Sequence, residues 1–162
     1  MNIPVQLNDI TTVVNYKNDE TLLYILRAMG LHSVRCGCTE GLCGSCSILL
    51  DGKTVPACLI PVGAVRERNI TTLEHFYTTK EYNDIKQGFD AAGITLCGYC
   101  NAGKIFTAHE IIATGQRPTP EDIAKRIQTL HCLCTDNSLL IQGIVNAFDI
   151  RYERLWSLKY AR

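Results

Sequence analysis

Nine of the 162 residues are cysteine, and four of them fall within the stretch CGCTEGLCGSC, from Cys36 to Cys46. Glycines separate these cysteines, and glycine lets a backbone adopt positive φ and wrap closely around a small object. The other cysteines are Cys58, the ends of a CGYC stretch (97–100) and the ends of a CLC stretch (132–134). An odd count excludes complete disulfide pairing within the chain. The cysteines therefore indicate metal or redox chemistry, and the fold must bring them together.

The overall composition excludes several classes of partner. Apolar residues make up 46% of the chain, the formal net charge is +0 and the pI is about 6.9. Such a balance argues against nucleic acid or an anionic membrane as the main partner. No run of apolar residues is long enough to span a bilayer, and the stretch MNIPVQLNDI has no signal-peptide character. We expect a cytoplasmic protein, where cysteines serve as metal ligands or catalysts more often than as disulfides.

The first part of the chain has mixed α and β signals. Residues 3–17 contain two strand-like runs around Asn8 and Asp9, and residues 47–57 contain two more around an Asp-Gly turn, so each stretch predicts a hairpin. Residues 18–30 have the apolar spacing of a helix and end in glycine. Two hairpins with one helix between them predict a small sheet wrapped on a helix.

The second part of the chain is predicted to be helical. Thr119 is placed as an N-cap, followed by Pro120 at the first helical position and Asp122 in a capping-box position. A polar stretch at 66–83 is interpreted as the place for a linker, with the domain boundary near His75. Four amphipathic segments follow, and since each can bury its apolar face only against the others, they predict a bundle: 81–93, 103–115, 119–130 and 138–155. We therefore expect an α+β chain with domains at 1–75 and 76–162.

The first cysteine group has a diagnostic spacing. Cys38, Cys43, Cys46 and Cys58 form C-x4-C-x2-C followed by a distant fourth cysteine, the plant-type ferredoxin arrangement for a 2Fe-2S cluster. Backbone N–H groups of such a glycine-rich loop can face the sulfurs and stabilise negative charge. Zinc is the rival metal, but its sites are usually built from two short knuckles, and this loop supplies three ligands at once. Cys36 falls outside the pattern and is interpreted as an ordinary free thiol.

The second cysteine group leaves more than one metal open. Cys97, Cys100, Cys132 and Cys134 fit a four-thiolate zinc site, an iron–sulfur site or a redox-active C-x-x-C pair. The redox interpretation lacks the βαβ context in which such motifs occur. Cys100 and Cys134 each precede a predicted helix, whose N-terminus favours a thiolate. The pattern alone does not separate iron from zinc.

Taken together, the two groups resemble one known family. The stretch GCTEGLCGSC, then Cys58, CGYC and CLC, resembles the small iron–sulfur subunit of the molybdenum hydroxylases, the xanthine oxidase family. The stretches DETLL, LLDGK, ITTLE and RPTPEDI match as well, and the resemblance covers about residues 3–150.

The resemblance implies a fold, cofactors and partners. It implies an N-terminal plant-ferredoxin-like β-grasp domain and a C-terminal four-helix bundle, each holding one 2Fe-2S cluster. By match, the first set of ligands is Cys38, Cys43, Cys46 and Cys58, and the second is Cys97, Cys100, Cys132 and Cys134. In this family a partner subunit carries molybdopterin, and electrons pass through the bundle cluster and then the ferredoxin-like cluster, usually to a subunit with FAD.

The chain departs from the family near the second group. Leu96, Leu133 and Asp136 stand where family members commonly have glutamine, arginine and glycine. That face usually meets the molybdopterin subunit, so the departures predict a different pterin contact or a divergent partner. The missing arginine also removes a positive charge, which should lower the potential of the second cluster if nothing compensates.

Three functions remain open from the sequence. The first is the electron-transfer subunit of a molybdenum hydroxylase, with no substrate chemistry in this chain alone. The second is a free-standing two-cluster electron carrier or redox sensor, and the third is a zinc-stabilised structural module.

Overall fold

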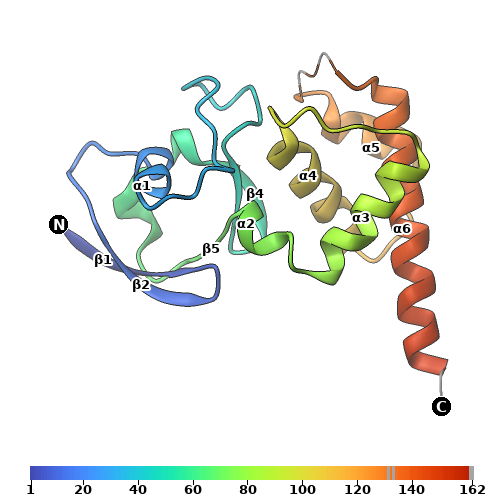
Figure 1. The fold of residues 1–162 in the computed structure, drawn as a ribbon, viewed down its shortest axis with the longest axis horizontal. Helices are drawn as coiled ribbons and strands as arrows, with labels where there is room; N and C mark the ends of the chain where they lie inside the picture. Colours follow the sequence, from blue (N-terminus) through green and yellow to red (C-terminus); the bar gives the residue numbers. More distant parts are fainter. Residues whose placement is uncertain (131, 133, 161–162) are drawn as a thin grey trace.

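The chain folds into two parts that lie side by side (Figure 1). The computed structural model describes residues 1–130, 132 and 134–160. The N-terminal part is a mixed sheet crossed by a helix, and the C-terminal part is a group of packed helices. The predicted α+β architecture is therefore confirmed. None of the helices in these ranges is long and apolar enough to cross a membrane.

Both predicted hairpins are present in the five-stranded sheet, whose strand order is β2-β1-β5-β3-β4. β1 pairs antiparallel with β2, and β3 pairs antiparallel with β4. The turn residues Asn8 and Asp9 have φ values of 53° and 65°, which tight hairpin turns require. The strands are β1 (Asn2–Leu7), β2 (Ile10–Asn15), β3 (Ser47–Leu50), β4 (Lys53–Pro56) and β5 (Asn69–Thr71).

The strand β5 corrects the interpretation of 66–83 as a linker. This strand lies in the middle of the sheet, parallel to β1 and antiparallel to β3, so the two hairpins are joined through it. The same stretch continues into α2 (Leu73–Phe76) and the start of α3 (Lys80–Ala91). The linker prediction is therefore wrong. The strand could not be recognised from the sequence because β5 has only three residues and buries one of them, Ile70, so it shows no apolar pattern.

The helix α1 (Leu22–Ala28) covers the sheet and completes the first core. Its buried residues pack in one cluster with strand residues such as Ile3, Ile48 and Ile70. The backbone N–H of Leu22 donates to the carbonyl of Ile60 at 2.8 Å, which ties the start of the helix to the segment after β4. That segment contains two short 3-10 helices, η1 (Ala57–Leu59) and η2 (Val62–Val65).

The predicted bundle is formed by α3, α4 (Asn101–Ala113), α5 (Pro120–Ile127) and α6 (Asn137–Tyr160). Thr119 caps α5 as predicted: its hydroxyl accepts from the N–H of Asp122 at 3.2 Å and donates to the Asp122 carboxylate at 2.7 Å. Helices α3 and α6 pack closely at Gly88, where an added Cβ would lie 2.4 Å from the backbone nitrogen of Ala147.

The two parts share apolar contacts across α2 and β3. Leu49 from β3 and Leu73 and Phe76 from α2 belong to the core of the helical part, whereas the rest of the sheet has its own core. The boundary between residues 75 and 76 falls inside α2, and the division into 1–75 and 76–162 stays a prediction.

A buried ion pair holds the second half of α6 to α3. Asp84 is 2% exposed, and its carboxylate accepts three hydrogen bonds from the Arg154 guanidinium, at 2.9, 3.2 and 2.6 Å. Beyond Arg154 the helix projects from the bundle, with Trp156 and Tyr160 exposed (Figure 1).

Candidate iron–sulfur sites

The first cysteine group lies in the loop between α1 and β3, with Cys58 supplied by η1. The β3–β4 hairpin brings Cys58 back to the loop. The register pairs Ser47 with Pro56, and the backbone N–H of Ala57 donates to the carbonyl of Cys46 at 3.1 Å. Cys46 and Cys58 are therefore held side by side and buried, at 1% and 6% exposure.

The thiols of this group lie close enough to influence one another, and Cys43 also acts on Cys46. The side chains of Cys38 and Cys43 interact with each other, and those of Cys46 and Cys58 do the same. Backbone N–H groups, that of Glu40 first, lower the pKa of Cys38 to about 7. Burial, followed by the crowding of neighbouring thiols, raises the pKa of Cys46 to about 12. A buried thiol with a raised pKa, such as that of Cys46, loses its proton when a cation binds it, because metal ions bind the thiolate.

The backbone around this group leaves no room for larger residues. A Cβ on Gly37 would lie 2.9 Å from Cys43 Sγ and 2.9 Å from Ser45 Oγ. The Ser45 hydroxyl is buried and has no hydrogen-bond partner among the described residues. A buried hydroxyl without a partner is costly, and a sulfur atom of a cluster held by the adjacent cysteines would accept a hydrogen bond from it. The loop therefore fits a 2Fe-2S cluster in its ligand chemistry, and the unpartnered Ser45 hydroxyl points to a missing acceptor there.

The second cysteine group gathers at one end of the bundle. Cys100 is the N-cap of α4, as predicted, and Cys97 precedes it in the same turn. Cys132 and Cys134 lie between α5 and α6, with their Sγ atoms 3.3 Å apart. Further thiol contacts join Cys97 to Cys134 and Cys100 to Cys132. The structure thus brings together all four residues that the resemblance implied.

The environment of the second group stabilises thiolates at its exposed side. The backbone N–H of Tyr99 lowers the pKa of Cys97, and the Thr135 hydroxyl lowers the pKa of Cys134. Burial raises the pKa of Cys100 to about 11. The thiol contacts join all four cysteines into one group, and a 2Fe-2S cluster takes four cysteine ligands. The residues of this group therefore fit a 2Fe-2S cluster as well.

No described group of three or more Cys, His, Asp or Glu side chains is arranged to hold a single metal ion.

Cys36 is exposed, and the thiol contacts within each set do not include it. His75 Nε2 lies 3.0 Å from the Asp9 carboxylate. The departure at Leu133 lies outside the described residues.

Lys104 is a residue of the site that sequence reasoning missed. It lies on α4 and is 1% exposed, and its Nζ is 2.7 Å from Thr135 Oγ1 and 3.5 Å from Cys134 Sγ. The signal that could have found it is its position four residues after Cys100, which places both on one face of a helix that is otherwise apolar there.

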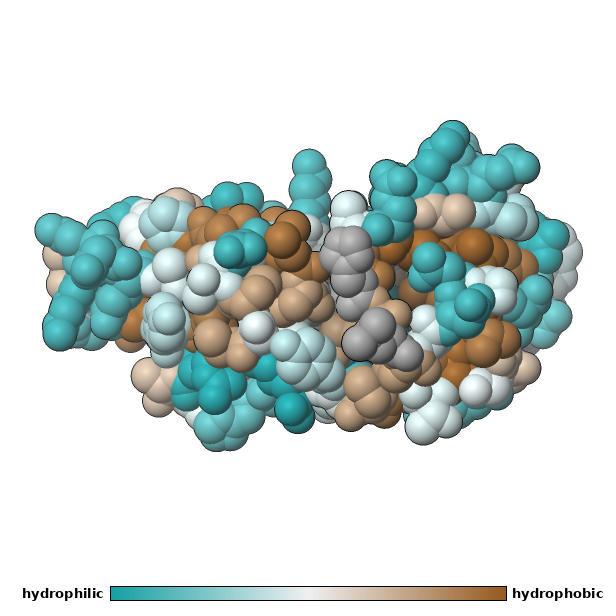
Figure 2. Space-filling model, turned by 90° about the horizontal axis from the view of Figure 1, so that it is seen from above, coloured by the Kyte–Doolittle hydropathy of each residue, from teal (hydrophilic) through white to brown (hydrophobic). Residues whose placement is uncertain are grey.

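The two cysteine groups meet where backbone approaches backbone. A Cβ on Gly103, in the first turn of α4, would lie 3.0 Å from the carbonyl oxygen of Gly44 in the first loop. A Cβ on Gly37 would lie 2.5 Å from the hydroxyl of Tyr99, which stands between two cysteines of the second group. Both loops lie on the upper side in Figure 1, and Figure 2 looks down on that side, where apolar residues gather across the middle.

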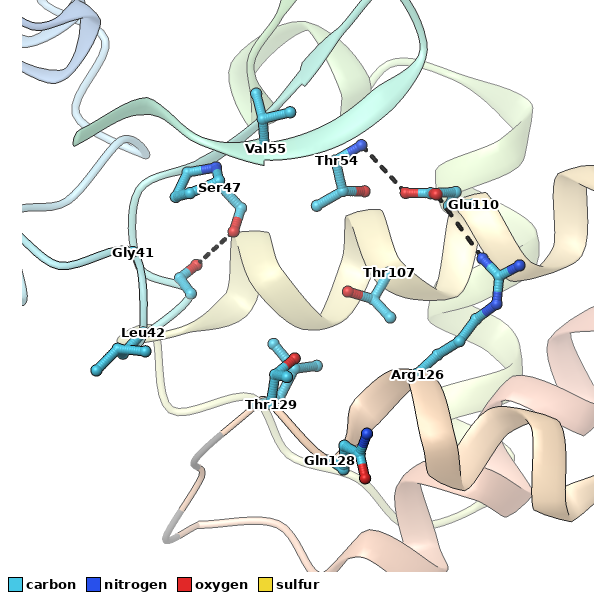
Figure 3. A pocket seen from close by; sticks show the side chains of 13 residues that line it. Gly41, Leu42, Ser47, Thr54, Val55, Thr107, Glu110, Arg126, Gln128 and Thr129 are labelled. Atoms are coloured by element: carbon cyan, nitrogen blue, oxygen red, sulfur yellow. Dashed lines mark hydrogen bonds and ion pairs between the residues drawn. The ribbon is translucent and has the colours of Figure 1, made fainter. Parts of the chain in front are cut away.

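A cleft of roughly 530 Å³ lies beside the first loop, between the β3–β4 hairpin, α4 and α5 (Figure 3). Among its described lining residues, the charged ones are Glu110 and Arg126, whose side chains are 3.7 Å apart. Glu110 also accepts from the backbone N–H of Thr54 at 3.1 Å. The carboxylate is therefore engaged in joining the two parts of the chain.

Comparison with known proteins gives two iron–sulfur domain families, one over each part of the chain. Residues 8–86 match a family described as a 2Fe-2S iron–sulfur cluster binding domain, and residues 72–147 match a family described as a 2Fe-2S binding domain. One of the subunits of nicotinate dehydrogenase from Pseudomonas putida is 31% identical over 92% of this chain and 96% of its own length. The small FeS subunit of nicotinate dehydrogenase from Eubacterium barkeri is 34% identical over 82% of this chain and 87% of its own.

A solved structure shows the same fold. A chain of quinoline 2-oxidoreductase from Pseudomonas putida 86 superposes with a TM-score of 0.83 at 28% identity. The match covers 94% of this chain and 96% of that one, so the sheet and the bundle are both included.

Proposed function

We propose a function from the premise that the chain belongs to the family of small iron–sulfur subunits of molybdenum hydroxylases. The chain is the electron-transfer subunit of such an oxidoreductase and binds two 2Fe-2S clusters. When bound, each cluster accepts and releases one electron. The residues of the chain hold the clusters, set their spacing and meet the partner subunits.

We assign one cluster to each group of cysteines. Cys38, Cys43, Cys46 and Cys58 would hold the first cluster, and Cys97, Cys100, Cys132 and Cys134 the second. The observation that carries this assignment is that the fold gathers each set of four cysteines in one place. Cys46 and Cys58 are held side by side, and the Sγ atoms of Cys132 and Cys134 are 3.3 Å apart. Four thiolates are the ligand set of a 2Fe-2S cluster.

The contact between the two loops supports transfer within the chain. Electron transfer through protein weakens steeply with distance, so two sites that exchange electrons must lie close. Gly44 and Gly103 let the loops touch at backbone level, and Tyr99 reaches from one loop to Gly37 in the other. A side chain at Gly103 would press on the Gly44 backbone, since its Cβ would lie 3.0 Å from the Gly44 carbonyl oxygen.

We propose that the partners are a large molybdopterin-binding subunit and an FAD-binding subunit or other acceptor. The second group faces the molybdopterin subunit, and the first group faces the acceptor. The support comes from the named relatives, which are subunits of multi-subunit enzymes, and from the exposure of Cys97 and Cys134 at one side of the second group. We also propose a cytoplasmic location, because all nine cysteines lack a disulfide partner.

Two of the sequence departures have local roles in the fold. Leu96 is half-buried against the helical core. The Asp136 carboxylate accepts from the N–H of Ser138 at 2.7 Å and so caps the start of α6. We propose that the pterin-facing surface is altered at these positions, since each now serves packing or capping inside this chain.

The test is a comparison of two cysteine variants in the assembled complex. Cys100→Ser should remove one reduced-state EPR signal and stop the reduction of the acceptor by substrate. Cys36→Ser is the matched control and should preserve both signals and the rate. Acceptor reduction at the normal rate in a Cys100→Ser complex that lacks the second cluster would refute the proposed order. A chain that purifies without any molybdenum-containing subunit would instead be a free-standing carrier.

A further inference from the structure

Lys104 is a cationic side chain buried inside the helical part. It is 1% exposed, and burial of an ammonium group is expensive unless polar or charged groups surround it. Its Nζ donates to Thr135 Oγ1 at 2.7 Å and to Cys134 Sγ at 3.5 Å. Thr135 is itself 8% exposed, so the ammonium and its oxygen partner are both enclosed.

The neighbours of Lys104 that can carry negative charge are cysteines. Among the described residues, no carboxylate lies within ion-pair distance of its ammonium. The groups that favour its charged form are the thiols of Cys132, Cys100 and Cys134, three of the four proposed ligands of the second cluster. A 2Fe-2S cluster with four thiolates is an anion, so its binding would supply the counter-charge that the described residues do not.

We propose that Lys104 sets the reduction potential of the second cluster by holding a fixed positive charge against its ligand sulfurs. This inference rests on the proposed assignment of the second cluster. Reduction adds one electron to the cluster, which makes it more negative. A cation at a fixed short distance therefore stabilises the reduced form more than the oxidised form, and hydrogen bonds to ligand sulfur act in the same direction. No proton or bond changes place in this step.

The geometry assigns this role to one cluster only. The Lys104 ammonium contacts Cys134 of the second group. The buried donor beside the first group is the neutral hydroxyl of Ser45, which has no partner among the described residues. A higher potential at the second cluster makes it a better acceptor for an electron that enters the chain there. Lys104 is thus a positioning and tuning residue for electron entry.

The test is a redox titration followed by EPR on the full chain loaded with both clusters. Lys104→Met removes the charge and keeps an apolar side chain of similar length, and Lys104→Gln removes the charge but keeps an N–H donor for Thr135. Both should shift the electron-sharing equilibrium toward the first cluster at least about tenfold, which is about 59 mV for a one-electron couple. Lys104→Arg should stay close to the wild type. Lys125→Met, at an exposed lysine on α5, is the matched control and should shift neither potential.

The outcomes separate this inference from the ligand assignment. The second signal is identified as the one that Cys100→Ser removes, and its absence in the wild type would refute the ligand assignment itself. The role of Lys104 would be overturned if both neutral variants keep the second cluster and change the electron-sharing equilibrium constant by less than about twofold. Loss of the cluster in both neutral variants, with its retention in Lys104→Arg, would support the same electrostatic role. Loss in all three would assign Lys104 to packing and overturn the proposal.

Discussion

Gly37 offers a direct test of how closely the first loop packs around the cysteines proposed as cluster ligands. In Gly37→Ala the new Cβ would lie 2.5 Å from the Tyr99 hydroxyl and 2.9 Å from both Cys43 Sγ and Ser45 Oγ. Ordinary contacts begin near 3.4 Å, so these atoms must move by roughly 0.5 to 0.9 Å. The tyrosine hydroxyl can swing away, but Cys43 is held by its place in the loop.

The cost of that displacement is about 1–3 kcal/mol, the usual range for overpacking. For a chain of this size, each kcal/mol lowers the midpoint of thermal unfolding by about 2–4 °C. We expect Gly37→Ala to lower the midpoint and to lose much of the first cluster, because Cys43 is one of its proposed ligands. The second cluster should remain. Iron analysis, reduced-state EPR and a thermal melt of the full chain measure all three effects.

A second glycine in the same part of the chain provides the control. A Cβ on Gly63 would meet only the Tyr16 side chain, with its hydroxyl 3.1 Å away. Because that hydroxyl ends a flexible side chain, Gly63→Ala should change stability by no more than about 0.5 kcal/mol and preserve both EPR signals. The reasoning is refuted if Gly37→Ala keeps full occupancy of the first cluster and melts with the wild type.

Three further predictions concern ligands, the ion pair and a cap. Cys43→Ser should abolish the first EPR signal and leave the second, because oxygen ligands suit iron–sulfur sites poorly; loss of both signals in a folded variant would contradict independent sites. Asp84→Asn should cost about 1–3 kcal/mol in urea unfolding, since it weakens the buried contact with Arg154, and an unchanged midpoint would show that the pair contributes nothing. Thr119→Ala should cost about 1 kcal/mol in the same assay and Thr119→Ser much less, because the hydroxyl caps α5; equal effects would rule out the capping bond.

Features that depend on neighbouring residues could be predicted from the sequence. The turns at Asn8 and Asp51, the cap at Thr119 and the glycine-rich cysteine loop all follow from local backbone chemistry. The spacing around Cys38 also predicted the first candidate site, since a plant-type loop encodes three of its four ligands within a few residues.

Features that depend on distant contacts could not be predicted. β5 has one buried residue, and its place in the sheet is set by pairing with strands far away in the sequence. Lys104 would ordinarily be interpreted as a solvent-facing residue, because its burial depends on Thr135 and Cys134, about thirty positions later. The sequence suggested that Leu133 leaves the second group without a positive charge, and the ammonium of Lys104 supplies one.

The most direct test of the central claim is a count of iron and acid-labile sulfide in the anaerobically purified full chain, together with EPR of its reduced form. We predict about four iron atoms and as many sulfides per chain, in two distinguishable signals, one lost with Cys43→Ser and the other with Cys100→Ser. Half that iron at full occupancy, or zinc in place of iron at either group, would contradict the assignment of a 2Fe-2S cluster to each cysteine set.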